Sequence, residues 1–87
     1  MSYEVRALPT AQKQYRKLPS GIRTRIGKQL ATLADNPRPA GVVKLQGVKD
    51  RWRIRVGNYR IVYRIDEAGN VIIVLIIAHR RDAYRSG

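Results

Sequence analysis

The sequence contains no cysteine, only one histidine and only six acidic residues in 87. The lack of cysteine excludes a disulfide framework, a thiolate metal site and a cysteine nucleophile. A zinc site that included His79 would have to take its other ligands from those six carboxylates. The chain therefore offers few groups that could hold a metal ion.

A long hydrophobic run is also missing. The longest apolar stretch, Val71 to Ala78, is far too short to span a bilayer, and residues 1–8 lack the apolar core of a signal peptide. Hydrophobic residues still make up 44% of the chain, which is typical of a globular protein and not of a disordered basic tail. We therefore predict a single cytoplasmic domain that covers residues 1–87 and has no contact with a membrane.

Positive charge is what the sequence has in excess. Eighteen Lys and Arg residues stand against six Asp and Glu, for a net charge of +12, and thirteen of the cations are arginine. Such a field attracts a polyanion, for example nucleic acid, the ribosome or an acidic protein. Guanidinium groups bind phosphate in a bidentate manner and stack on bases. A merely solvated surface is the alternative, but the one-sided charge favours a polyanion partner.

The first half of the sequence predicts a strand followed by two helices. Residues 3–8 alternate with period two, which indicates a strand. Two stretches with apolar residues at helical spacing follow, residues 11–18 and residues 20–34, and we expect Thr10 and Ser20 to cap them. Pro37 ends the second helix. About three residues join the two helices, so they form an antiparallel hairpin.

The second half predicts strands. A short extended piece covers residues 42–45, and longer strands cover residues 51–56, 59–66 and 71–79. The order β-α-α-β-β-β defines an α+β fold, with a small, mainly antiparallel sheet that carries the helical hairpin on one face. The last strand is apolar on both faces, so we expect it to be central and covered on both sides, or covered by helices on one face and by a partner on the other.

The stretch RWRIRVGNYRIVYR at residues 51–64 predicts a hairpin with a defined register. Gly57-Asn58 is a two-residue turn signal, and a turn of that length pairs Arg55 with Arg60 and Arg51 with Arg64. One face then carries core residues: Trp52, Ile54, Val56, Tyr59, Ile61, Tyr63 and Ile65. The other face, which we call the arginine face, carries Val62 together with Arg51, Arg53, Arg55, Arg60 and Arg64.

The arrangement of charges on the arginine face is expected to destabilise the sheet. Like charges directly opposite each other on neighbouring strands destabilise a sheet. We therefore expect these side chains to be exposed and to be completed by an anionic partner. On this prediction Arg60→Ala leaves the fold intact. A solvated outer face is the alternative.

The segment after the last strand extends this surface. His79, Arg80 and Arg81 bring further cations and an imidazole, and Tyr84 brings a ring of the kind that stacks on bases beside phosphate contacts. Tyr84 could instead cap the sheet edge, and His79 could bond to the backbone.

Five short motifs now point to a family. They are KLP at 17–19, NPR at 36–38, KLQG at 44–47, YRIVYRID at 59–66 and HRRDAYR at 79–85. In this order and spacing, the sequence resembles the RelE-type toxins of the RelE/ParE toxin–antitoxin superfamily over nearly its whole length. The resemblance implies a core similar to that of microbial ribonucleases. It also implies cleavage of messenger RNA on the ribosome and neutralisation by an antitoxin that wraps around the toxin.

The resemblance also implies roles for residues. It places catalytic groups at Arg55, Arg60, Arg80 and Tyr84, with Arg81 as an alternative to Arg80, and a phosphate contact at Arg53. The hairpin register and the segment after the last strand add further expected substrate contacts at Arg51, Arg64, Arg81 and His79. RelE has lysines at the positions of Arg53 and Arg55, and one of them is proposed as its general base. Arginine stays protonated, so the proton acceptor here is either His79, the one residue of a type that titrates near neutral pH, or a group supplied by the ribosome or the RNA.

The implied reaction is metal-free and needs no cofactor. The 2′-hydroxyl attacks the adjacent phosphate and expels the 5′-oxygen. The implied partners are a RelB-like antitoxin, the ribosome and mRNA, with operator DNA reached only through the antitoxin complex. Two alternatives stay open: a ParE-like inhibitor of gyrase, which shares the fold, and a non-catalytic module that binds nucleic acid.

Overall fold

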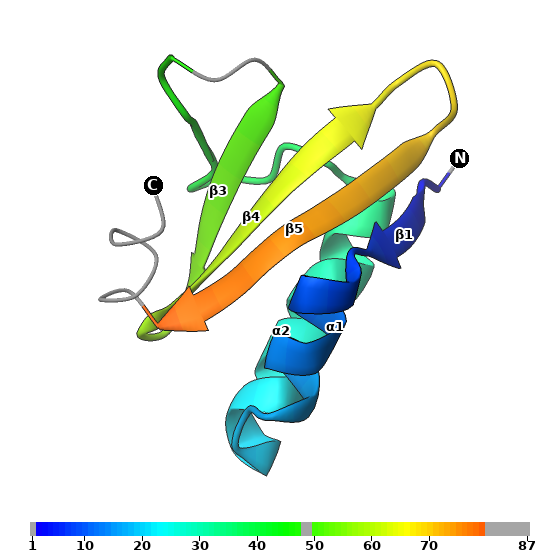
Figure 1. The fold of residues 1–87 in the computed structure, drawn as a ribbon. Coiled ribbons are helices and arrows are strands. Elements are labelled where there is room, and N and C mark those ends of the chain that lie inside the picture. Colours follow the sequence, from blue (N-terminus) through cyan, green and yellow to red (C-terminus); the bar gives the residue numbers. More distant parts are fainter. Residues whose placement is uncertain (1, 48–49, 80–87) are drawn as a thin grey trace.

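The structure is a computed structural model that describes residues 2–47 and 50–79. Two helices and five strands follow one another along the chain (Figure 1): β1 Glu4–Ala7, α1 Pro9–Arg16, α2 Ser20–Asp35, β2 Val43–Lys44, β3 Arg51–Val56, β4 Tyr59–Asp66 and β5 Val71–His79. The predicted order of elements is therefore confirmed. The short extended piece expected at residues 42–45 contributes the two-residue strand β2.

The five strands form one sheet in the order β1-β5-β4-β3-β2. Strands β2, β3, β4 and β5 pair antiparallel, whereas β1 pairs with β5 in parallel over Glu4 to Ala7. Along the chain, the helical hairpin and strands β2, β3 and β4 separate β1 from β5. A parallel pair of strands requires a long connection of this kind. The α+β fold with a mainly antiparallel sheet is confirmed.

The helices begin differently from the prediction. Helix α1 starts at Pro9 with Leu8 as N-cap, and α2 starts at Ser20 with Pro19 as N-cap, and neither N-cap residue makes a side-chain capping hydrogen bond. The expected caps Thr10 and Ser20 are therefore wrong. At α1, proline is favoured at the first helical position because its φ is preset and it has no N–H to satisfy. In the described part of the chain, no helix is both long enough and apolar enough to cross a bilayer.

The core lies between the helices and one face of the sheet. Ala11, Ile26 and Leu33 from the helices are fully buried, and they pack in one cluster with Ile61 and Ile72 from the sheet. Trp52 and Tyr59 pack against this cluster and are partly buried. Each fully buried aliphatic side chain stabilises the fold by about 1.5–3 kcal/mol. The predicted core face of the hairpin is thus confirmed.

Strand β5 contains a bulge that its uniformly apolar sequence did not indicate. Val62 pairs with Ile76, but the next residue, Tyr63, pairs with Val74, so Leu75 is an additional residue in β5. Because of this shift, Val74 and Ile77 both enter the core although three positions separate them. An unbroken strand would point them to opposite faces.

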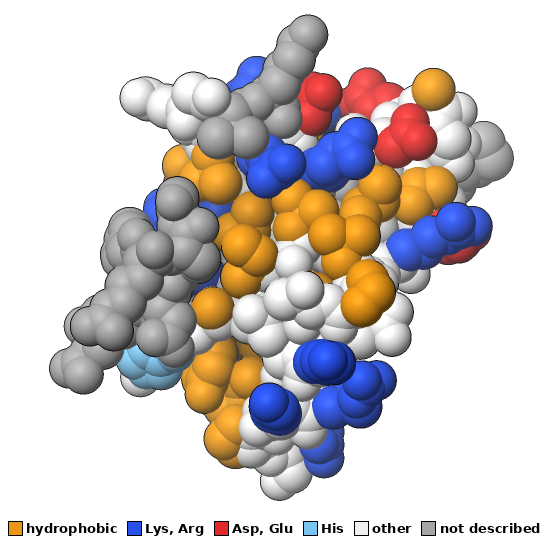
Figure 2. Space-filling view, in the orientation of Figure 1, with side chains coloured by type: hydrophobic (Ala, Val, Ile, Leu, Met, Phe, Trp, Pro, Cys, Tyr) orange, Lys and Arg blue, Asp and Glu red, His pale blue; other side chains and the backbone are white. Residues whose placement is uncertain are grey.

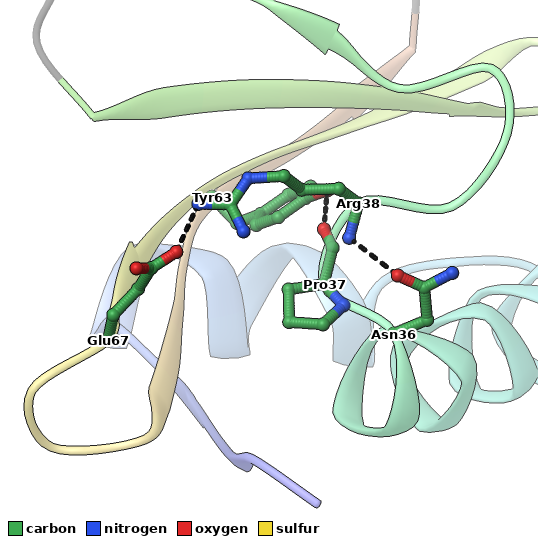
Figure 3. Close-up of polar contacts among 5 residues, drawn as sticks. All are labelled: Asn36, Pro37, Arg38, Tyr63 and Glu67. Atoms are coloured by element: carbon green, nitrogen blue, oxygen red, sulfur yellow. Dashed lines mark hydrogen bonds and ion pairs between the residues drawn. The ribbon is translucent and has the colours of Figure 1, made fainter.

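Two buried polar groups tie the layers together. The Tyr63 hydroxyl donates to the carbonyl oxygen of Pro37 at 2.7 Å, which fixes the loop after α2 against β4 (Figure 3). The backbone N–H of Ile77 donates to Oε1 of Gln14 at 2.7 Å, which links β5 to α1. These bonds satisfy groups that would otherwise be costly to bury.

We predict that Tyr63 makes stability depend on pH in strongly alkaline solution. Burial raises the pKa of Tyr63 from 10.0 to about 12. The unfolded chain therefore loses this proton first, and the free energy of unfolding falls by at most about 1.4 kcal/mol per pH unit between pH 10 and pH 12. Below pH 10 the contribution of Tyr63 is fully present.

Urea unfolding of the chain and of Tyr63→Phe, across this range, tests the prediction. The variant lacks the hydroxyl and should show a shallower pH dependence. It should also be less stable at pH 8, by about 1 kcal/mol, because the Pro37 carbonyl loses its donor. Equal slopes for both proteins would contradict the role of Tyr63.

Candidate nucleic-acid interface

The β3–β4 hairpin has the register that its turn predicts. The two predicted pairs, Arg55 with Arg60 and Arg51 with Arg64, are present, and the four pairs between them and beside the turn follow the same register. Gly57 has φ +60° at the first central position of the turn, a conformation that glycine adopts without strain. The arginine face is therefore confirmed as one side of β3 and β4, opposite the core.

Exposure varies across this face more than the sequence predicts. Arg55 is exposed, whereas Arg51, Arg53 and Arg64 are half-buried. Arg60 is only 4% exposed, so the expectation that it is exposed is wrong. Its strand β4 lies between β3 and β5, and its neighbours across the ladders are Arg55 and the small Ala78. Arg60 is thus buried on a central strand, whereas its cross-strand partner Arg55 on β3 is exposed.

The burial of Arg60 changes what a substitution there can test. Removing a buried side chain of this size leaves space behind, and such changes commonly destabilise a fold. Arg60→Ala is therefore expected to lose stability as well as any function. Exposed Arg55, its cross-strand neighbour, is the position where function can be separated from folding.

His79 does not lie with the arginine side chains. It pairs with Tyr59 at the end of β5, and residues opposite each other in an antiparallel pair share a face. The two rings meet edge to face, with 5.4 Å between their centroids. Tyr59 packs against the core cluster, so His79 belongs to that side of the sheet. The predicted residues Arg80, Arg81 and Tyr84 lie outside the described residues.

A second group of cations, which the sequence did not indicate, surrounds Trp52. The guanidinium carbon of Arg38 lies 5.0 Å from the Trp52 ring centroid, and the Lys44 ammonium lies 5.8 Å from it. Both are within the range of cation–π attraction. Arg38 also forms an ion pair with Glu67 (Figure 3). Lys44 pairs with Trp52 across β2 and β3. A prediction of the register between these two strands would therefore have placed Lys44 beside the Trp52 ring.

Strand β5 adds an apolar stripe beside the arginine face. Ile73, Ile76 and Ala78 pair with Arg64, Val62 and Arg60 and are half-buried. Figure 2 shows hydrophobic side chains along β5, with Lys and Arg side chains toward β3 and β4 on one side and over the helices on the other, and with Asp and Glu side chains near the β4–β5 turn. This face therefore combines a hydrophobic strip with flanking positive charge. Within residues 2–47 and 50–79, no three His, Asp or Glu side chains gather as metal ligands would.

Comparison with known proteins identifies the class of this protein. A family model described as the ParE toxin of type II toxin–antitoxin systems, parDE, matches residues 5–84. The chain is 31% identical over 86 residues to Toxin RelG of Mycobacterium tuberculosis, a match that covers 98% of this chain and 99% of RelG. It is 30% identical over 82 residues to the mRNA interferase toxin RelE of Escherichia coli K12, and that match covers 92% of this chain and 81% of RelE.

Solved structures agree with these relatives. A chain of the archaeal RelE–RelB complex of Pyrococcus horikoshii matches with a TM-score of 0.81 and 29% identity, over 92% of this chain and 97% of that chain. A chain of the intact E. coli RelBE toxin–antitoxin complex matches with a TM-score of 0.80 and 30% identity, over 90% of this chain and 96% of that chain. The chain therefore belongs to the type II toxins of the RelE/ParE superfamily, and within them to the RelE-type toxins. These relatives do not favour the ParE-like alternative.

We predict that reversing one charge on the arginine face stabilises the fold. Arg55→Glu places a carboxylate opposite Arg60 and replaces repulsion by attraction, so the free energy of unfolding should rise by about 0.5–1 kcal/mol in low salt. Arg55→Gln removes only the repulsion and should lie between the two proteins. Urea unfolding at low and high salt measures this, and the differences should shrink at high salt. A glutamate variant less stable than the parent would show that the two guanidinium groups do not repel.

Proposed function

We propose that this chain is an endoribonuclease that cleaves messenger RNA bound to the ribosome. The observation that carries the proposal is the cross-strand pair Arg55 and Arg60, one exposed and one buried, within a face of five arginines. The names of two relatives support it, since RelE of E. coli K12 and RelE of Shigella flexneri are called mRNA interferases.

Phosphate cleavage needs what this face offers. When a 2′-hydroxyl attacks the adjacent phosphorus and the 5′-oxygen leaves, negative charge gathers on the phosphoryl oxygens. Guanidinium groups that are already held in place stabilise this charge more than they stabilise the ground state, which lowers the barrier. Exposed Arg55 is the member of the pair that can contact the phosphate directly, and buried Arg60 adds positive charge beside it in a medium of lower dielectric. The products are a 2′,3′-cyclic phosphate and a 5′-hydroxyl.

The remaining residues take supporting roles in the proposal. Arg53 binds a flanking phosphate, and half-buried Arg51 and Arg64 extend the path of the RNA along the hairpin. Arg80 is proposed to act on the reacting phosphate as well, and Arg81 is proposed to bind the substrate. Tyr84 stacks on a base or orients the 2′-hydroxyl.

The proposed reaction needs a group that accepts the proton of the attacking 2′-hydroxyl. Five guanidinium groups and Val62 make up the arginine face as the described residues define it, and none of these groups accepts a proton near neutral pH. His79 shares the opposite side of the sheet with Tyr59. We therefore assign proton acceptance to the ribosome or to the RNA itself, and we expect cleavage only when the message is bound to ribosomes.

A RelB-like antitoxin is the proposed protein partner. Solved relatives are found in complexes with RelB, in Pyrococcus horikoshii and E. coli among others. An acidic segment with one apolar side could cover the arginine face and the stripe of Ile73, Ile76 and Ala78 together. Covering that surface would block the RNA. Operator DNA, in this proposal, is reached only through the antitoxin complex.

Cleavage of a translated message in a reconstituted translation system tests the activity. Primer extension should map cuts inside codons on ribosome-bound message and none on free RNA. Arg55→Ala should slow cleavage by about a hundredfold or more, because it removes a guanidinium from the developing charge. Its thermal midpoint should stay close to that of the parent, because Arg55 is exposed.

Lys13→Ala is the matched control. It removes the same charge from an exposed position on α1, away from the arginine face, and should cleave as the parent does. If the folded parent cuts neither ribosome-bound nor free RNA, the activity is not that of a ribonuclease. Retention of RNA binding in that case would identify a binding module, and inhibition of gyrase in a supercoiling assay would restore the ParE-like alternative.

A further inference from the structure

A basic groove lies between α2 and the turn end of the β3–β4 hairpin, next to the arginine face. It has a volume of about 320 Å³ and is lined on one side by Arg25, Lys28, Gln29 and Thr32 of α2, and on the other by Arg55, Val56 and Gly57 of the hairpin. The four α2 residues recur at i, i+3, i+4 and i+7, so they form a single stripe along the helix. Arg55 therefore belongs both to the arginine face and to this groove.

The turn glycine lets the two walls approach each other. Gly57 has φ +60°, and a Cβ built on it would lie 3.1 Å from Nη1 of Arg25. A side chain at this position would be strained and would crowd the guanidinium. The lack of a side chain at Gly57 thus allows Arg25 to lie over the turn.

The charged residues that line the groove all have the same sign. None of its lining residues is acidic, and residues 7–34 contain six Lys and Arg but no Asp or Glu. The acids of the described chain lie elsewhere, at Glu4, Asp35, Asp50, Asp66 and Glu67, and two of them are in ion pairs with Arg6 and Arg38. The hairpin end of the molecule therefore presents positive charge without local neutralisation by carboxylates from these segments.

The lining also indicates which polyanion fits. An acidic peptide helix would need apolar anchors, but Val56 is the one apolar side chain in the lining and is only 7% exposed. Proteins that hold single-stranded RNA stack its bases on aromatic rings, and no aromatic residue is among those that line the groove. Arg25 and Lys28 are exposed and Gln29 is half-buried, and all three side chains can donate hydrogen bonds to phosphate oxygens. The groove therefore suits contacts with a phosphate backbone.

We propose that this groove binds the phosphate backbone of double-helical RNA without reading its sequence. The contact is separate from the arginine face but continuous with it through Arg55. It extends the proposed function, and rests on it only for the choice of RNA as the polyanion. Structured RNA held in the groove would position the enzyme while a single strand crosses the arginine face.

Binding of a fluorescent 2′-O-methyl RNA duplex, followed by anisotropy over a range of salt, tests the proposal. This duplex lacks the attacking hydroxyl, so cleavage plays no part in the result. Arg25→Gln with Lys28→Gln should bind about tenfold more weakly, and the slope of log K against log salt should fall by about two. Lys13→Gln with Lys17→Gln removes the same charge from exposed positions outside the groove and should have a clearly smaller effect.

Further variants separate charge from shape. Arg25→Lys with Lys28→Arg keeps both charges and should keep most of the affinity and the slope, and circular dichroism should show all variants folded. Equal losses in the two glutamine pairs would overturn the proposal and leave the ribonuclease proposal standing. A groove pair that loses affinity for a poly-glutamate peptide, but not for the duplex, would also overturn it, in favour of a protein partner. Duplex binding that depends on the groove, in a chain that cuts no message, would refute only the ribonuclease.

Discussion

The two-residue turn at Gly57-Asn58 is the constraint on which the rest of the structure depends. It fixes the register of β3 against β4, and a shift of one residue would exchange the two faces of the hairpin. The core would then receive guanidinium groups in place of Ile54 and Ile61. The same turn brings β3 close to α2, since a glycine there leaves room for Arg25. One short loop thus positions the core, the arginine face and the groove.

The hairpin combines a stabilising face with a destabilising one. On the core side, Ile54, Ile61 and Tyr63 are buried against the helices, and each contributes more than a like-charge pair costs. The sheet can therefore carry two arginine pairs in direct opposition and remain folded. A surface that holds several positive charges close together also attracts an anion, which would relieve their repulsion. Such surfaces are typical of functional sites, where the local order is less stable than it could be.

Charge is distributed unevenly over the whole molecule. The described acids lie near the start of β1, at the end of α2, directly before β3 and around the β4–β5 turn, whereas the hairpin end and both helices up to Ala34 are cationic. A polyanion that approaches this protein meets a positive field that favours the hairpin end. The arginine face and the groove lie on either side of that end and share Arg55.

Much of the fold followed from the sequence because its signals are local. The helical spacing, the period-two alternation and the turn signal predicted the elements, the hairpin register and the membership of the arginine face, and each involves residues close together in the chain. The sequence could not predict that Arg60 is buried, because that depends on β5 lying beside β4. The bulge at Leu75, the position of His79 beside Tyr59 and the approach of Arg25 to Gly57 likewise required the tertiary structure. These features arise between segments far apart in the chain, where packing and not local pattern decides which side chains meet.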